Sequence, residues 1–132
     1  MNETPAGPTV LVVDEDVGFI WWLAELLAED GYRSIPALGC RQALSLIKSS
    51  DGAVELALVN PRLRGATRLI AALRQYRTSK IVLIQEPEAP HSPIEGAIAF
   101  LEKPAGSAPV SRLEWRQKLR RLLLQIGIRA AS

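Results

Sequence analysis

The sequence contains one cysteine and one histidine, and both shortages exclude whole classes of site. Cys40 has no partner for an internal disulfide and cannot build a cysteine metal cluster, so we expect a buried free thiol. Because His91 is the single histidine, a histidine-pair metal site is excluded. The proline-rich surroundings of His91 predict a solvated loop residue. No glycine-rich loop of the kind that cradles phosphate groups is present.

Long apolar runs are also missing. No uncharged stretch approaches the ~20 residues of a membrane-spanning helix. The opening residues MNETPAGP lack the basic-then-apolar order of a secretory signal. We therefore expect a cytoplasmic protein without membrane insertion. Its 132 residues suit one domain over residues 9–127, with a flexible start over 1–8 and a C-terminal tail over 128–132.

Acidic residues are scarce in the last part of the chain. From Lys103 onward there are seven basic residues and one acidic residue, a net charge of +6. Residues 1–102 hold nine basic and thirteen acidic residues, a net charge of −4. This asymmetry predicts an electrostatic face for a partner.

Unbroken apolar runs alternate with segments of helical periodicity. The runs predict buried parallel strands, and the periodic segments predict helices that pack on them. Strands are expected within residues 9–14, 32–39, 55–59, 80–85 and 97–104, and helices from residue 19 to the stop at Gly31 and within 41–50, 66–76 and 111–127. The alternation predicts an α/β fold with a mostly parallel sheet.

One connection, residues 86–96, lacks the helix that this alternation requires. Pro87, Pro90 and Pro93 recur every three residues, and each removes an amide donor and disfavours helix before it. We expect at most one helical turn, with Ser92 as its N-cap. The fourth helix is therefore predicted to be shortened or missing.

Polar residues follow the predicted strands where each strand ends. Asp14, Glu15 and Asp16 follow the first strand, and Asn60, Gln85 and Lys103 close the third, fourth and fifth. Because the carboxyl ends of parallel strands meet at one rim of the sheet, we expect these side chains to converge. Asp16 is also a plausible helix N-cap.

The segments LVVDED, LALVNPRLRG, IVLIQE and AFLEKP, in this order, resemble the receiver domain of two-component response regulators. The resemblance covers roughly residues 9 to 126. It implies a flavodoxin-like, doubly wound, five-stranded parallel sheet of order 2-1-3-4-5. It also implies a site in which an acidic pair holds Mg²⁺ and an aspartate ending strand three accepts a phosphoryl group from a histidine kinase.

The match to that family is partial. Asp14 and Glu15 fit the acidic pair, and Phe100 fits the aromatic switch position. Lys103 fits the lysine that reads the phosphate, before a proline whose peptide bond is typically cis in the family.

Two positions of the predicted site depart from the family pattern. Asn60 stands where the phosphoacceptor aspartate is expected, and Gln85 stands where a serine or threonine is expected. A neutral amide lacks the carboxylate nucleophile that an acyl phosphate needs. Removing one anion also weakens a Mg²⁺ site, so Mg²⁺ binding should be weak at best. We predict a degenerate site with no enzymatic activity and no cofactor, in which Lys103 pairs with Asp14 or Glu15 and Asn60 bonds to either.

If phosphorylation is absent, the protein should signal through residues on its surface that contact a partner. Ile20 and Trp21 are expected on an outward face of the first helix, and Trp115, Arg116 and Arg120 on the last helix. These residues predict a protein partner, self-association included. Three alternatives stay open: nucleic-acid binding through the basic last helix, phosphorylation on Glu15 or Asp16, and a merely solvated basic face.

Overall fold

Strands and helices alternate along the part of the chain that the computed structural model describes, which is residues 7–49, 53–76, 80–87, 94–104 and 109–130. The strands are β1 (Thr9–Val13), β2 (Arg33–Ala37), β3 (Leu56–Val59), β4 (Lys80–Gln85) and β5 (Ala99–Glu102). The helices are α1 (Val17–Glu29), α2 (Cys40–Ser49), α3 (Ala66–Leu73) and α4 (Pro109–Gln125). Among these helices, none combines the length and apolar character that a bilayer crossing requires.

All neighbouring strands pair in parallel, in the order β2-β1-β3-β4-β5. This confirms the predicted flavodoxin-like order. The central strands β1, β3 and β4 are apolar and buried almost throughout because helices cover both of their faces. Pro36 lies in β2, which is an edge strand, as the sequence predicts for a residue without a backbone N–H.

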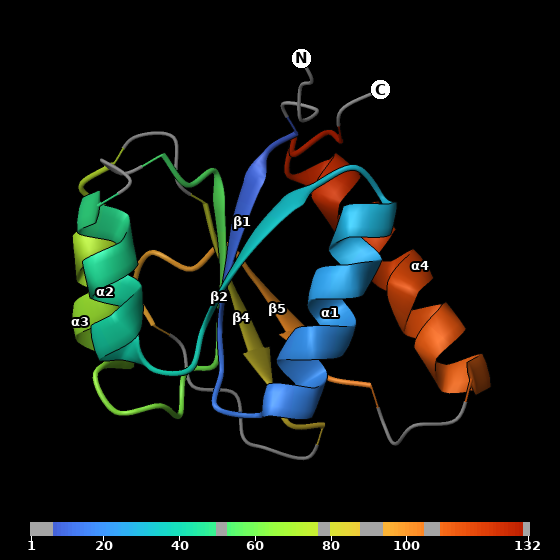
Figure 1. Cartoon of the computed structure of the whole chain (residues 1–132), viewed down its shortest axis with the longest axis horizontal. Helices are drawn as coiled ribbons and strands as arrows, with labels where there is room; N and C mark the ends of the chain where they lie inside the picture. The colour runs from blue at the N-terminus through green and yellow to red at the C-terminus, as the bar shows by residue number, and fades with distance from the viewer. Residues whose placement is uncertain (1–6, 50–52, 77–79, 88–93, 105–108, 131–132) are drawn as a thin grey trace.

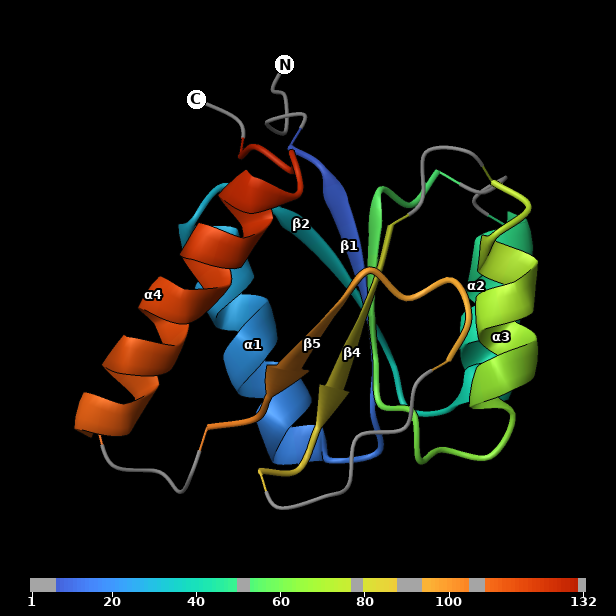
Figure 2. The ribbon, with the colours of Figure 1, turned by 180° about the vertical axis from the view of Figure 1, so that it is seen from behind.

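The two faces of the sheet carry separate cores. Helices α1 and α4 cover one face, and α2 and α3 cover the other (Figures 1 and 2). Alternate residues of β1 serve the two sides: Val10 and Val12 pack towards α1 and α4, and Leu11 and Val13 towards α2 and α3. Cys40 is a buried free thiol in the second core, as predicted, and burial raises its pKa.

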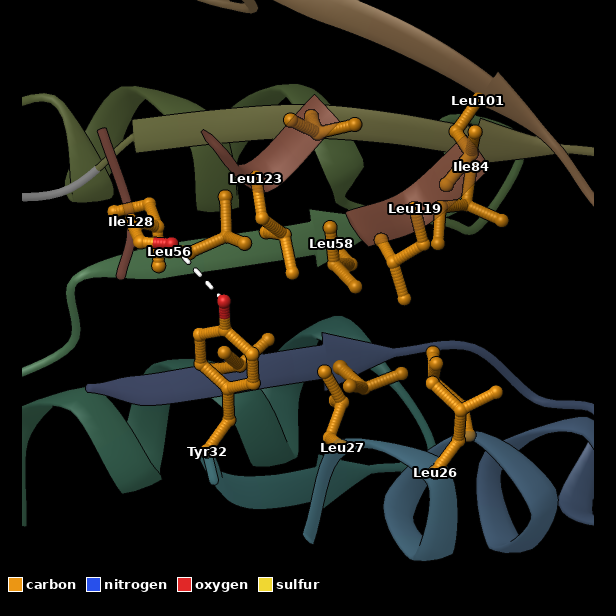
Figure 3. Close-up of a cluster of buried hydrophobic side chains, with 14 of the residues drawn as sticks. Leu26, Leu27, Tyr32, Leu56, Leu58, Ile84, Leu101, Leu119, Leu123 and Ile128 are labelled. Atoms are coloured by element: carbon orange, nitrogen blue, oxygen red, sulfur yellow. Dashed lines mark hydrogen bonds between the residues drawn. The ribbon is translucent and has the colours of Figure 1, made fainter. Parts of the chain in front are cut away.

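The core beneath α1 and α4 extends past the end of α4 (Figure 3). The Tyr32 hydroxyl donates a hydrogen bond of 3.0 Å to the carbonyl of Ile128. Ile128 is buried, so this residue, which the sequence placed in the tail, belongs to the core. The predicted segments 1–8 and 128–132 otherwise fall mostly outside the described residues.

No helix is present between β4 and β5 among the described residues of that connection, which are 86–87 and 94–98. Ile94 and Ala97 pack instead against the core on the α2 and α3 side. This agrees with the prediction that the fourth helix is shortened or missing. The turn expected at Ser92 and the solvated His91 lie outside the described residues.

Asp30, the C-cap of α1, fastens this helix to α4. Its carboxylate accepts hydrogen bonds from Arg116 at 2.7 Å and from Arg120 at 2.7 and 3.0 Å. The hydrogen bond from Arg120 lowers the pKa of Asp30, against burial, which raises it, and Arg116 adds to the lowering.

We expect Asp30→Asn to reduce the free energy of unfolding by about 1–3 kcal/mol at neutral pH, since charge-assisted hydrogen bonds are lost. The folded-state pKa of Asp30 lies below the unfolded-state value of about 4, so this contribution is complete above that value. It disappears as the pH falls through the folded-state pKa. Urea unfolding of both proteins at neutral and acidic pH measures the difference, with Glu25→Gln, an exposed carboxylate on α1, as control. A difference that does not shrink in acid would contradict this role.

Candidate functional site

The buried polar side chains of the described residues gather at the rim, the edge of the sheet where the strands end. Asp14, Asn60, Gln85 and Lys103 are 1–7% exposed, and they follow or close β1, β3, β4 and β5. We call these four residues the rim cluster. Its position confirms the predicted convergence of strand-end residues.

Lys103 is the cation at the centre of the rim cluster. Its ammonium lies 2.8 Å from Asp14, 2.9 Å from Glu86 and 4.0 Å from Asp16. It also lies 4.9 Å from the centre of the Phe19 ring. Burial alone would lower the pKa of Lys103, but hydrogen bonds to Asp14 and Glu86 outweigh it and the pKa is raised. Lys103 is therefore a fully engaged cation.

The Asp14 carboxylate is likewise fully engaged. One oxygen accepts from the Asp16 backbone N–H at 2.9 Å, and the other contacts Lys103 and the Asn60 amide. Asp16 itself caps α1, as predicted, by accepting from the Phe19 N–H at 3.1 Å. The predicted pairing of Lys103 is thus confirmed, with Asp14 as the partner. Glu15 is exposed and takes no part in the ion pairs of Lys103.

Asn60 is oriented by two hydrogen bonds of opposite kind. Its side-chain NH₂ donates to Asp14 at 3.4 Å, and its side-chain oxygen accepts from the Arg62 backbone N–H at 2.9 Å. An ionised aspartate at this position could only accept hydrogen bonds and could not donate to Asp14, whereas the amide does both. The site is therefore built around a neutral group at this position.

The Gln85 side chain is buried without hydrogen-bond partners. Its backbone carbonyl accepts from the Lys103 N–H at 2.9 Å, but neither polar atom of its side chain has a hydrogen-bond partner. Such a group costs about 1–3 kcal/mol relative to its hydrated state. The carboxamide fills protein volume at the rim where the resembling family has a smaller hydroxyl.

Two expectations drawn from the resemblance concern Phe100 on β5 and the peptide bond before Pro104, directly after this strand. Phe100, which the resemblance matches to an aromatic switch position, lies on this edge strand and is 38% exposed. The peptide bond between Lys103 and Pro104 is trans, so the expected cis bond is absent.

The donor set at the rim does not fit Mg²⁺. The buried carboxylate of Asp14 is paired with an ammonium at 2.8 Å, and the Asn60 oxygen faces a backbone N–H. Within the described part of the chain, no group of three or more histidine, cysteine, aspartate or glutamate side chains is arranged to hold a metal ion. Mg²⁺ prefers several anionic or neutral oxygens around one position, and these residues do not supply them.

Two residues of the predicted interaction surface are buried instead. Ile20 and Trp115 are each 4% exposed, so their placement on the surface is wrong. Ile20 belongs to the core face of α1. Trp115 contacts Phe19 and Trp22 at ring-centre distances of 6.0 and 5.2 Å and donates its indole N–H to the Glu102 carbonyl.

Arg116 and Arg120 are partly exposed but are not free cations. Both pair with Asp30 at 2.7 Å, and Arg116 also lies 3.1 Å from Glu29. The intrachain pairs reduce the basic character that the sequence predicts for this face. Of the three apolar residues predicted on this surface, Ile20, Trp21 and Trp115, only Trp21 keeps its predicted exposure, at 68%.

Sequence reasoning missed Glu86 as a partner of Lys103. This residue directly follows the strand-end Gln85, so counting one residue further along each strand would have placed it at the rim. It also missed Arg112, whose guanidinium lies 4.8 Å from the centre of the Trp22 ring.

Comparison with known proteins points to one fold. No family model and no curated protein matches the chain. A response regulator receiver domain (CheY-like) from Methylobacillus flagellatus is 19% identical, with 92% of this chain and 99% of that chain covered and a TM-score of 0.72. The signal receiver domain of an HD domain-containing protein from Pseudomonas fluorescens Pf-5 is 24% identical, with coverage of 90% and 93% and a TM-score of 0.71. The response regulator protein TrrA from Thermotoga maritima, in complex with Mg²⁺-BeF, is 24% identical, with coverage of 88% and 99% and a TM-score of 0.64.

The chain therefore has the fold of response-regulator receiver domains. Sequence identities below 25% support the shared fold alone, so the chemistry at the rim is argued from the residues of this chain.

Proposed function

We propose that this receiver-fold domain takes up no phosphoryl group and acts as a protein-interaction module in bacterial signal transduction. In this proposal the domain is cytoplasmic, has no enzymatic activity and needs no resident cofactor. Signalling through it depends on its surfaces and on the amount of protein present.

Asn60 carries the proposal. A receiver takes up phosphate through a carboxylate at the end of strand three, and here that position holds an amide fixed between Asp14 and the Arg62 N–H. The amide nitrogen has its lone pair delocalised into the carbonyl and bears no charge. It cannot form the acyl phosphate.

The surroundings of Asn60 support the same conclusion. Lys103, which would stabilise an incoming phosphoryl group, is held by Asp14 and Glu86. The Gln85 carboxamide fills the rim on the β4 side and is 1% exposed. An incoming phosphate would have to displace these groups as well as find a nucleophile.

The alternatives have weaker support. Asp16 is committed to capping α1, and Glu15 lies at the surface outside the ion pairs of Lys103. Nucleic-acid binding through α4 would need its basic residues, yet Arg116 and Arg120 are paired with Asp30. The alternatives predict a phosphoryl adduct or salt-sensitive nucleic-acid binding, and we expect neither of the proposed module.

Thermal unfolding with Mg²⁺ and beryllofluoride, a phosphoryl mimic, tests the proposal. A ligand that binds the folded state raises Tm by mass action, so we expect a shift smaller than about 1 °C for this chain. TrrA, which binds Mg²⁺-BeF in its structure, is the positive control. A rise of several degrees that requires both Mg²⁺ and beryllofluoride would contradict the proposal.

A further inference from the structure

The basic residues among the first 102 positions are confined to two stretches of the chain. Residues 31–50 and 56–85 contain all nine of these basic residues and no acidic residue. Among the elements that these stretches form, helices α2 and α3 lie side by side on one face of the sheet (Figures 1 and 2). Both helices therefore carry positive charge without acidic residues, although residues 1–102 together have a net charge of −4.

Four exposed arginines lie at the end of this layer where α2 and α3 begin. They are Arg41 in α2, Arg62 and Arg64 in the loop before α3, and Arg68 in α3. The loop packs against the start of α2, since a Cβ atom on Gly65 would lie 3.4 Å from the Cβ atom of Cys40. Gly65 directly follows Arg64 and Cys40 directly precedes Arg41, so the arginines of the two elements are brought together. We call the four arginines the arginine patch.

The arginine patch has no intrachain counter-ion among the described residues, because none of its four side chains forms an ion pair there. The basic face of α4 differs in this respect, since its Arg116 and Arg120 are paired with Asp30. Neither α2 nor α3 has an acidic residue in its first turn, so the partial positive charge of each helix N-terminus adds to the patch. A guanidinium group binds a carboxylate through two parallel hydrogen bonds, so this charge suits an acidic partner.

Acidic residues flank the arginine patch at the rim. Strand β3, which leads into the loop with Arg62 and Arg64, lies between β1 and β4 in the sheet. Exposed Glu15 and Asp16 follow β1, and exposed Glu86 follows β4. The basic surface at this edge is therefore short, and it suits an anion that is short as well.

We propose that the arginine patch binds a short acidic segment of a partner protein. The inference rests on the proposed function, because it names the chemistry of the partner that a module acting through contacts requires. Aspartate or glutamate side chains of the segment pair with the guanidinium groups, and the flanking carboxylates of the rim limit the contact to a few residues. The attraction is electrostatic, so binding weakens as the salt concentration rises.

Longer polyanions fit this surface less well. A nucleic acid or an anionic membrane presents negative charge over a wide area and would also approach Glu15, Asp16 and Glu86, which repel it. Four cations release few counter-ions from DNA or RNA, and the patch contains no aromatic side chain on which a base could stack. A short acidic peptide avoids both drawbacks.

An NMR titration of the ¹⁵N-labelled protein with hexaglutamate tests the inference. We expect saturable shifts of the backbone amide signals of Arg41 and of residues 62–68, with a dissociation constant below about 1 mM at low salt. Hexaglutamine, which has the same length and no side-chain charge, is the matched control and should cause no such shifts. Absence of saturable shifts with hexaglutamate, or shifts centred on α4 instead, would overturn the proposal.

Two double charge reversals test the location of binding. Arg62→Glu/Arg64→Glu should weaken hexaglutamate binding at least about tenfold through like-charge contacts. Lys118→Glu/Arg121→Glu makes the same change in net charge at two exposed residues of α4, on the other face of the sheet, and should change binding less than about twofold. All four positions are exposed, and circular dichroism checks that both variants fold. Equal weakening in the two variants would overturn the proposal.

Two further probes separate the other polyanions from the acidic segment. A short DNA duplex of mixed sequence and vesicles containing phosphatidylserine should each bind more weakly than hexaglutamate at the same salt concentration. Tighter binding of either probe that is lost in Arg62→Glu/Arg64→Glu would overturn the proposal in favour of that polyanion. Because the beryllofluoride experiment measures phosphoryl chemistry alone, failure of hexaglutamate binding leaves the proposed absence of phosphoryl uptake standing, and the reverse also holds.

Discussion

A Lys103→Met variant is expected to lose about 3–5 kcal/mol of unfolding free energy, because it leaves a buried carboxylate without its counter-ion. Asp14 is 2% exposed and lies 2.8 Å from the Lys103 ammonium. Glu86 loses the same partner, but it is 57% exposed and water replaces the contact at little cost. Urea unfolding of the variant and the parent protein measures the loss.

Two further variants separate the ion pair from general damage to the rim. Adding Asp14→Asn to Lys103→Met should recover a large part of the loss, since no charge is then buried alone. Lys48→Met, at an exposed lysine of α2, should change stability by no more than about 0.5 kcal/mol. A loss below about 1 kcal/mol for Lys103→Met would show that the pair does not organise the rim.

Asn60→Asp is expected to destabilise the protein by about 2–4 kcal/mol in the absence of divalent metal. In the parent protein the Asn60 NH₂ lies 3.4 Å from the Asp14 carboxylate. In the variant a second carboxylate replaces this donor, so the hydrogen bond is lost and two negative charges face each other. Among the described residues, Lys103 is the cation that pairs with Asp14, and it would have to screen both charges. Raising the pH from about 4 to about 7 should widen the difference from the parent protein, because the added group ionises over this interval.

Mg²⁺ should reverse part of this loss in the variant alone. Two adjacent carboxylates form the kind of oxygen site that the parent protein lacks, so Mg²⁺ should raise Tm for Asn60→Asp and leave the parent unchanged. Asn60→Ala is the matched control, because it removes the hydrogen bonds without adding charge and should not respond to Mg²⁺. An Asn60→Asp protein as stable as its parent without metal would contradict the proposed role of the neutral amide.

The composition of the rim was predictable because it follows from short-range pattern, whereas the strand order was expected from the resemblance to receiver domains. The apolar runs of β1, β3 and β4 are typical of buried strands in a covered parallel sheet, and such strands end at a common edge. Asp14, Asn60 and Lys103 therefore converge without any further information.

The phase of α1 was not predictable from its sequence. Residues 19–23 are five consecutive apolar residues, so periodicity alone does not say which of them face the core. The tertiary contacts that accompany the observed phase are not local: Trp115 of α4 lies beside Phe19 and Trp22, and Trp22 is only half-buried. In this phase Ile20 faces inward and Trp21 outward.

The ion-pair partners of the charged residues on α4 could not be predicted from the sequence either. Arg116 and Arg120 pair with Asp30, 86 and 90 positions away, and nothing local in α4 indicates this. The unsatisfied amide of Gln85 also appears only once its neighbours are in place. Charge on a predicted helix face is thus a poor guide to free charge on the folded surface.

The claim that the rim cluster takes up no phosphoryl group is tested most directly by intact-protein mass spectrometry after incubation with acetyl phosphate and Mg²⁺. The account predicts no added phosphoryl group on the parent protein, and slow or no uptake by Asn60→Asp while the Gln85 side chain remains. The Asn60→Asp/Gln85→Thr double variant, with both the nucleophile and the smaller hydroxyl restored, should gain one acid-stable, base-labile phosphoryl group. A phosphoryl adduct on the unaltered chain would contradict the account.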